Sequence, residues 1–422
     1  MWSAIVSCWA LLLGMGLLML GNGLQGSLLG LRAVLEGFET ATTGLVMTGY
    51  YVGFLAGSLL VPRMVRRVGH IRVFAALASL ASIAVLLHTV LIDPVTWTAM
   101  RLVTGFAYAG LYIVAESWLN DQGTNRTRGQ LLSVYMVIQL GAMALGQLLL
   151  NVADPGGFLL FIAVSVLVSL ALVPILLTVA PAPSFDEPSH VGLLDLYRIS
   201  PLGVVGAFAI GTAHGSVFGM GAVYAERAGL NVAEISVFMA LYLVGGMVLQ
   251  WPIGRLSDRF DRRLVLTAVT LVAAAAAIVA VVAPGLHHIA LFAVIGLFGG
   301  LSLPMYSLCL AHTNDYLEPR QMVAASSSLV MLTGIGACLG PFSVAMIMSL
   351  IGAEGFFWWV GGIHAGIGVF AIWRMSRRPS LPAEEQGPFV AVPPRASPLA
   401  AAVTPKKVRD QLDRDLARLS GR

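Results

Sequence analysis

Long runs of apolar residues, separated by short polar connections, fill the chain from about residue 9 to residue 374. A run of roughly 20 apolar residues is long enough for an α-helix to cross the hydrocarbon core of a bilayer. About twelve runs are near that length: 9–31, 40–61, 72–92, 96–118, 128–150, 157–180, 201–225, 233–253, 264–283, 288–311, 322–350 and 356–374. The pattern predicts an all-α membrane protein with 12 transmembrane helices.

The composition excludes a soluble enzyme. Hydrophobic residues make up 58% of the chain, charged residues make up 11%, and the mean hydropathy is +0.85. A soluble domain carries roughly a quarter charged residues. No basic residue precedes Arg32, and no small-residue cleavage site leads into a soluble domain. A cleaved signal peptide has both features, so we expect the first run to be retained as a span.

Basic residues gather in every second connection between the runs. The odd-numbered connections hold only Arg32 and Arg227. The even-numbered connections hold the larger set, which is Arg63, Arg66, Arg67, Arg72, Arg126, Arg128, Arg198, Arg255, Arg259, Arg262, Arg263 and Arg320. Because Lys and Arg accumulate in cytoplasmic loops, we expect a multi-pass protein of the cell (inner) membrane with both termini in the cytoplasm. The net charge of +4 then reflects topology, and we expect no nucleic-acid partner.

The second half of the chain repeats the first at a nearly constant offset. The matched pairs, with offsets that rise only from 189 to 194, are residues 25–30 with 214–219, Tyr50 with Tyr242, Gly53 with Gly245, Tyr112 with Tyr306 and Gly146 with Gly340. Such an order is hard to obtain by chance, so we predict a duplicated six-span unit.

The repeat predicts the division of the chain. We expect a six-helix bundle at 1–180, a cytoplasmic linker at 181–200, a second six-helix bundle at 201–375 and a cytoplasmic tail at 376–422. The tail is rich in Pro and Ala as far as Val403 and is predicted to be mostly disordered. Thr404 and Pro405 then predict the start of a short helix.

A charged segment between the eighth and ninth runs, WPIGRLSDRFDRR at residues 251–263, resembles the signature loop of the major facilitator superfamily. Residues 62–70 match it as a degenerate first copy, with Arg66 in place of the acid. The resemblance implies the major facilitator fold of two six-helix bundles, in which Asp258 bonds helix ends of its own half. A basic loop that only sets topology is the alternative. The implied conformational latch consists of Gly254, Asp258, Arg259, Arg262 and Arg263.

Two charged residues lie inside predicted spans, where a central charge costs at least about 2.5–3.5 kcal/mol. Arg101, followed by Gly105, is similar to the Arg-x-x-x-Gly pattern on the fourth helix of the superfamily, which implies a role in proton or substrate coupling. An arginine that reaches outward to the membrane interface is the alternative. Glu116 lies about 22 Å further along a helix, too far to pair with Arg101. We expect Glu116 to carry a coupled proton, to gate or to anchor a loop.

His214 is the central candidate for a coupled proton. It lies near the middle of the seventh run, and Gln25 has the equivalent place in the first run. Histidine titrates near neutrality; a histidine hydrogen-bonded between helices is the alternative. The resemblance implies that helices one, four, seven and ten line the substrate cavity, and residues of other spans either join them or only hold helices together. The predicted substrate cavity is Asn22, Gln25, Tyr50, Tyr112, Gln139, His214, Tyr242 and Tyr306, and the predicted proton-coupling residues are His214, Glu116 and Arg101.

Other polar residues are predicted to be structural. Asp121 and Asp315, at the ends of spans four and ten, are predicted to cap helices. His88 and His364 have no partner in the repeat and are assigned no transport role. Three cysteines, Cys8, Cys309 and Cys338, lack metal or disulfide spacing and are predicted to be small buried residues.

The sequence contains no Gly-x-x-x-x-Gly-Lys-Ser/Thr nucleotide loop, catalytic triad or metal-ligand cluster. We therefore expect no enzyme activity, no cofactor and no bound metal. The prediction is a secondary active transporter that moves a small organic solute by alternating access. Its expected partners are that solute, protons as the coupling ion and the lipid bilayer, with no obligatory protein partner.

Two other functions stay open. The first is a drug, metabolite or lipid exporter of the same fold. The Gly-Pro pair typical of drug-efflux members belongs on span five, but here it stands on span eleven as Gly340-Pro341. The second is a transport-inactive membrane scaffold or receptor whose tail recruits a partner.

Overall fold

The computed structural model describes residues 8–122, 128–177, 192–282, 288–377, 381–382 and 386–392, without the side chains of residues 122, 128–130, 319 and 320. The first half contains α2 (Trp9–Leu35), α3 (Thr40–Val68), α4 (His70–Val90), α5 (Pro94–Gln122), α6 (Arg128–Leu148), the short 3₁₀ helix η1 (Leu149–Asn151) and α7 (Leu159–Leu177). The second half contains α8 (Leu193–Ile199), α9 (Pro201–Arg227), α10 (Val232–Arg259), α11 (Arg262–Val282), α12 (His288–Ser302), α13 (Met305–Asn314), α14 (Pro319–Ile351) and α15 (Gly355–Met375). Within the described residues, 12 segments are long and apolar enough to cross a membrane, which confirms the predicted all-α membrane fold.

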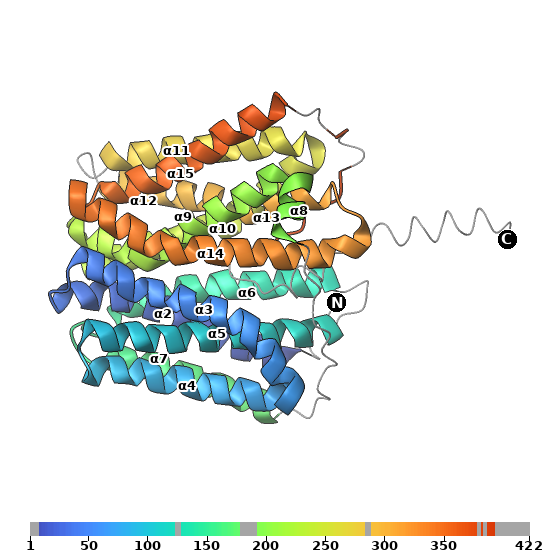
Figure 1. Ribbon diagram of the computed structural model, residues 1–422. Coiled ribbons are helices and arrows are strands. Elements are labelled where there is room, and N and C mark those ends of the chain that lie inside the picture. The colour runs from blue at the N-terminus through green and yellow to red at the C-terminus, as the bar shows by residue number, and fades with distance from the viewer. Residues whose placement is uncertain are drawn as a thin grey trace.

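The long helices run side by side, so that all connections lie at two ends of the molecule. Figure 1 shows α2 to α7 as one group and α9 to α15 as a second group stacked on it. We call the end that holds the α3–α4, α5–α6, α10–α11 and α13–α14 connections the basic end, because the sequence places most arginines there. The other end is the opposite end.

Three boundaries differ from the predicted runs. The predicted loop at residues 62–68 is helical, because α3 continues through Pro62 as far as Val68. The two arginines Arg262 and Arg263 begin α11 instead of belonging to a loop. The tenth span is broken into α12 and α13 at Pro304, which has no N–H to continue the helical hydrogen bonds.

Matched glycines allow the same close helix crossing in both halves. In the first half a Cβ atom at Gly105 in α5 would overlap the backbone carbonyl of Tyr50 in α3. In the second half a Cβ atom at Gly299 in α12 would overlap the carbonyl of Tyr242 in α10. Small residues are the usual way for membrane helices to approach closely. The repeat mates Tyr50 and Tyr242 therefore occupy equivalent places in the packing.

The two halves are in contact at the opposite end and apart at the basic end. At the opposite end, Nδ2 of Asn151 donates a hydrogen bond of 2.7 Å to Oγ of Ser236 in α10. Gly44 of α3 lies so close to Ala345 of α14 that a Cβ atom would overlap it. Toward the basic end, by contrast, a cavity of about 470 Å³ lies between α6 and α10. The halves are therefore closed at the opposite end and separated between α6 and α10 at the basic end, an arrangement that we call open at the basic end.

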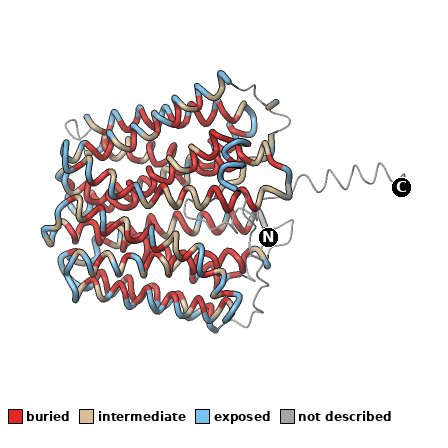
Figure 2. Tube along the Cα trace, in the orientation of Figure 1, coloured by how far each residue is buried: buried red, intermediate tan, exposed pale blue. Residues whose placement is uncertain are grey.

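Apolar side chains cover the outer faces of the helices. Large residues such as Leu170, Val173, Val248 and Ile278 are exposed, which is expected for surfaces that face lipid chains instead of water. Figure 2 shows the buried residues along the inner faces of the helices. The outer surface is thus consistent with a bilayer around the bundle.

Parts of the predicted linker and tail lie outside the described residues. This holds for residues 181–191 of the linker and for the predicted helix that begins near Thr404. Within the described part of the linker, α8 forms at Leu193–Ile199. The predicted disorder, which runs as far as Val403, does not hold for residues 386–392, because they pack against the basic end and include Val392, a fully buried side chain.

Candidate functional site

His214 is held by the break in the tenth span. The helical ladder of α12 ends at Ser302, and Nε2 of His214 lies 3.2 Å from the Ser302 carbonyl oxygen. A carbonyl oxygen only accepts hydrogen bonds, so Nε2 carries the hydrogen in the neutral ring. The basic lone pair of His214 is then on Nδ1, the atom that would take up a proton.

A second histidine, His364, also hydrogen-bonds to Ser302 at this break. Thr270 Oγ1 donates to the His364 carbonyl at 3.0 Å, and it lies 3.1 Å from His364 Nδ1. Because the one hydroxyl hydrogen of Thr270 goes to the carbonyl, His364 Nδ1 carries a hydrogen and donates to Thr270. His364 Nε2 then accepts from Ser302 Oγ at 3.0 Å. His364, for which the sequence predicted only a structural role, thus positions the residue whose carbonyl orients His214.

A cavity beside His214 joins the two halves. It measures about 50 Å³ and is lined by Tyr50 and Phe54 from α3 together with His214, Phe218 and Tyr306 from α9 and α13. The remaining lining comes from Tyr51, Gly211, Val330, Thr333, Gly334 and Ala337. Three of the eight predicted cavity residues therefore meet here, although they are far apart in the sequence.

Arg101 reaches this cavity through Tyr50. Its side chain is only 4% exposed, so it does not extend outward to the membrane interface, which was the alternative from the sequence. The Arg101 guanidinium carbon lies 4.4 Å from the centre of the Tyr50 ring, a distance typical of a cation–π interaction. Arg101 can therefore fix the position of a ring that lines the cavity.

Replacing Tyr50 tests this contact. A desolvated cation–π pair contributes about 2 kcal/mol, so Tyr50→Leu should lower the free energy of unfolding by about that amount more than Tyr50→Phe does. Tyr50→Phe is the matched control because it keeps the ring and loses only the hydroxyl. The comparison is made by denaturant unfolding of the purified protein in detergent. Equal losses in the two variants would mean that the ring does not stabilise Arg101.

Glu116 lies within the first half and is 1% exposed. Tyr135 of α6 donates a hydrogen bond of 3.2 Å to its carboxylate. The carboxylate is also within electrostatic range of Tyr306 in the second half. Glu116 and Arg101 lie 15 positions apart on the continuous helix α5, so they are too far apart to pair directly, as the helical spacing predicted.

The other predicted cavity residues are buried near α2 and α6 or in α10, and they do not line the cavity at His214. Tyr112 contacts the sulfur atom of Met19, and the ring of Tyr242 packs against Phe218 at 5.6 Å. Several buried polar atoms lack a hydrogen-bond partner among the described residues: Asn22 Nδ2, both amide atoms of Gln25, Gln139 Nε2 and the Tyr306 hydroxyl. Buried polar groups are normally satisfied by protein, water or ligand, so these atoms can bind a polar solute or water.

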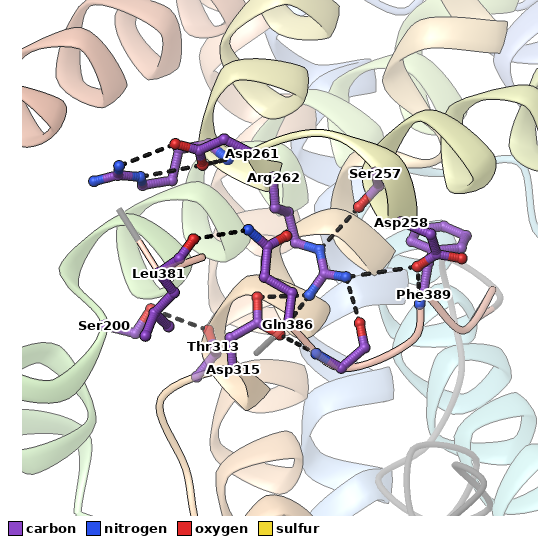
Figure 3. A network of polar contacts seen from close by, with 12 residues as sticks. Ser200, Ser257, Asp258, Asp261, Arg262, Thr313, Asp315, Leu381, Gln386 and Phe389 are labelled. Carbon is purple, nitrogen blue, oxygen red and sulfur yellow. Dashed lines mark hydrogen bonds and ion pairs between the residues drawn. The ribbon is translucent and has the colours of Figure 1, made fainter. Parts of the chain in front are cut away.

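The predicted latch surrounds Arg262, whose side chain is 1% exposed. Its Nε donates to Ser257 Oγ at 2.8 Å, and its Nη1 lies 2.6 Å from both carboxylate oxygens of Asp315 (Figure 3). Asp315 stands at the C-cap of α13, as predicted, and its carboxylate is in addition the ion-pair partner of Arg262. Burial raises the pKa of the Asp315 carboxyl, and the Arg262 guanidinium opposes that rise.

The remaining latch residues have different surroundings. Asp258 Oδ1 accepts a hydrogen bond of 2.6 Å from the backbone N–H of Phe389 in the tail, and it lies 3.7 Å from Nη2 of Arg262 at the start of α11 (Figure 3). Arg259 is exposed. Arg263 pairs with Asp261 at 3.0 Å; partial burial would raise the pKa of Asp261, but the hydrogen bonds from Arg263 outweigh it and the pKa lies below its usual value.

Comparisons with known proteins agree with this geometry. The family model described as Major Facilitator Superfamily matches residues 11–238 and again residues 203–410. The chain belongs to the Major Facilitator Superfamily and is a multi-pass membrane transporter of that class. A protein from Escherichia fergusonii described as an uncharacterized MFS-type transporter, YcaD, is 31% identical over 316 residues, which are 74% of this chain and 81% of the relative. YcaD from Escherichia coli O45:K1 is 30% identical over the same shares.

Solved structures show the same fold at low identity. A bacterial homologue of the human lysosomal transporter Spinster, in an inward-facing and occupied conformation, matches with a TM-score of 0.71 at 16% identity and covers 90% of this chain and 98% of its own. The nucleoside transporter NupG matches with a TM-score of 0.69 at 12% identity, covering 87% of this chain and 97% of its own. A D-xylose–proton symporter matches with a TM-score of 0.69 at 11% identity, covering 87% and 97%. These likenesses confirm the predicted major facilitator fold.

Proposed function

We propose that the protein is a secondary active transporter that moves a small organic solute by alternating access, with His214 as the site of the coupled proton. The observation that carries the proposal is the cavity in which His214 meets Tyr50 of the other half. A group at this place can respond to both the solute and the relative position of the halves. The carbonyl of Ser302 holds one ring nitrogen, so proton uptake is directed to Nδ1.

The lining of the cavity favours an uncharged solute with an apolar or aromatic part. Apart from His214, its polar groups are hydroxyls such as those of Tyr306 and Thr333, and none of the described residues that line it is a carboxylate, Lys or Arg. A sugar phosphate or a di-acid carries charge that a buried site must match with cations. The amides of Asn22, Gln25 and Gln139 would add hydrogen bonds if the solute extends toward α2 and α6.

The other predicted residues take supporting roles in this proposal. Arg101 positions Tyr50, and Glu116 is a second proton-binding group on the first half. The bundles at 1–180 and 201–375 would rock against each other, with the basic end in the cytoplasm because of its arginines. The protein would then lie in the inner membrane in its inward-open conformation.

A pH-sensitive dye inside proteoliposomes tests the coupling. A panel of neutral solutes, beginning with nucleosides and pentoses, is added to purified protein in liposomes that contain pyranine. We expect one class of solute to drive proton movement in the wild-type protein. In His214→Gln that movement should fall at least about tenfold, because glutamine cannot bind the proton although its amide can still donate to Ser302.

The control is His288→Gln. His288 lies at the surface, where its ring contacts Glu234 at 2.6 Å, so this variant should keep wild-type proton movement. Equal proton movement in His214→Gln and the wild type would refute the assigned site. Solute counterflow without any proton movement in the wild type would refute proton coupling. A transport-inactive receptor would show neither counterflow nor proton movement.

The cavity between α6 and α10 favours a second candidate, an amphipathic solute taken from the membrane. Its lining is mostly apolar, with Arg255 and Asp258 near the basic end. Val137 and Trp251, which also line it, are apolar side chains that are more than half exposed. Single-chain amphiphiles therefore belong in the same panel, and selective counterflow of these compounds would assign the protein to lipid transport.

A further inference from the structure

Residues 386–392 of the tail, which we call the strap, return to the body of the protein. They lie at the basic end across α10, α11 and α13, and the family resemblance predicted no contact of this kind. Figure 3 shows Gln386 and Phe389 of the strap beside Asp258, Arg262 and Asp315. The contacts fall into a polar set and an apolar set.

The polar contacts join side chains of the helices to the backbone of the strap. Gly387 donates its N–H to Asp315 Oδ1 at 2.9 Å, and its carbonyl accepts from Arg262 Nη2 at 2.6 Å. Further along, the Phe389 N–H bonds to Asp258. Ser307 Oγ accepts from the Val392 N–H at 2.9 Å. The two acids and the buried arginine of the basic end thus all bind the strap.

The apolar contacts depend on a glycine of the signature segment. A Cβ atom at Gly254 would lie 2.6 Å from Cδ1 of the Phe389 ring, so only glycine leaves room for the ring at this distance. Val392 is 1% exposed. Gly254 therefore leaves the space into which the Phe389 side chain of the tail packs.

The strap also lies between the two halves. Phe389, Val390 and Ala391 line the cavity of about 470 Å³ together with α10 of the second half and Met136 of α6 in the first half. At the opposite end, Asn151 of η1, which directly follows α6, is in contact with Ser236 of α10. Closing the basic end would bring α6 and α10 together there and remove the space that these strap residues occupy.

We propose that the strap is a built-in wedge that holds the basic end open and must leave its seat before that end can close. The proposal rests on the alternating access proposed above. It assigns the signature residues Gly254 and Asp258 to binding the tail in the open conformation. Release of the strap then sets how often the transporter reaches the conformation that is closed at the basic end.

Distances between spin labels test the wedge in the full-length protein. One pair, Arg67→Cys with Leu256→Cys, spans the halves at the basic end; the other, Ile92→Cys with Arg227→Cys, spans them at the opposite end. All four positions are exposed, and the native cysteines are replaced by serine. Truncation after Arg377 removes the strap, whereas truncation after Pro394 keeps it and is the matched control.

We expect truncation after Arg377 to raise the ratio of basic-end-closed to basic-end-open molecules by about tenfold or more. Its basic-end distances should shorten and its opposite-end distances should lengthen, while truncation after Pro394 should match the full-length protein. The double variant Phe389→Ser, Val392→Ser provides the same test without shortening the chain. Unchanged distances in the folded double variant would overturn the wedge. If the distances are unchanged and the wild-type protein drives solute-dependent proton movement, only the wedge fails and the proposed transport function stands. If the distances are unchanged and the wild-type protein shows no counterflow or proton movement, both proposals fail.

Discussion

Replacing Arg262 with glutamine is expected to lower the free energy of unfolding by about 3–5 kcal/mol, the usual loss when one partner of a buried ion pair is removed. The reason is that the Asp315 side chain is only 3% exposed and would lose the cation that faces both of its oxygens. Ser257 and Gly387 would lose a donor as well. Denaturant unfolding of the purified protein measures the change.

A surface ion pair in the same half is the control. Arg198 and Asp195 lie 3.4 Å apart with side chains that are 70% and 66% exposed, and such pairs contribute about 0–1 kcal/mol. Arg198→Gln should therefore have little effect. If Arg262→Gln loses no more stability than Arg198→Gln, the buried pair does not stabilise the basic end.

The loss of unfolding free energy in Arg262→Gln should also depend on pH. Burial raises the pKa of Asp315, and the Arg262 guanidinium opposes that rise. In Arg262→Gln this opposing charge is gone, so the pKa rises further. A carboxyl whose folded-state pKa is above its unfolded value stabilises the folded protein at low pH and loses that contribution as pH rises through the folded-state pKa. The deficit relative to the wild type should thus grow from about pH 4 upward. A deficit that shrinks as pH rises would contradict this account.

Gly105→Ala is expected to lower the free energy of unfolding by about 3 kcal/mol, the upper part of the range for overpacking. The added methyl group would overlap the backbone carbonyl of Tyr50, and a backbone group cannot turn away as a flexible side chain can. The α3 and α5 helices would have to separate, which also moves the ring that lines the cavity. We therefore expect weaker solute binding in addition, measured as a smaller ligand-induced rise in melting temperature.

Gly141→Ala is the matched control for this substitution. Gly141 also lies inside a helix, but a Cβ atom there would meet nothing within 4 Å. Alanine is the better helix former by up to about 1 kcal/mol, so this variant should be as stable as the wild type or slightly more so. Gly299→Ala, at the repeat-related crossing, should behave like Gly105→Ala. Equal stability of Gly105→Ala and Gly141→Ala would contradict the packing described here.

The sequence predicted the spans and the repeat because both depend only on the composition and the spacing of residues along the chain. Twenty apolar residues can cross a bilayer whatever surrounds them, and Tyr50 and Tyr242 stand at the same place in two copies of one pattern. The resemblance placed His214 and Tyr306 on helices that line the cavity, whereas Tyr50, on the second span, was predicted either to join them or only to hold helices together. The burial of Arg101 against Tyr50 excludes an arginine that reaches outward to the membrane interface, and its role in coupling stays a prediction.

The features that could not be predicted depend on contacts between residues far apart in the chain, and no pattern of residue types along the sequence indicates them. Arg262 and Asp315 are 53 residues apart, and the acid stands where a helix cap is expected. His364 gains its role only because Pro304 breaks a helix beside it. The strap binds mainly through backbone N–H and C=O groups, which every sequence possesses, so its Pro- and Ala-rich composition indicated disorder instead.

The contact at the opposite end sets an energy scale for transport. There the halves meet through the hydrogen bond of Asn151 with Ser236 and through glycine-lined surfaces, and one such hydrogen bond is worth only about 1 kcal/mol net. A difference of one pH unit across the membrane supplies about 1.4 kcal/mol for each proton that moves. Under the proton coupling proposed above, breaking this hydrogen bond requires work of the same order as a gradient of one pH unit provides, so that a modest gradient can bias which side of the membrane the transporter faces.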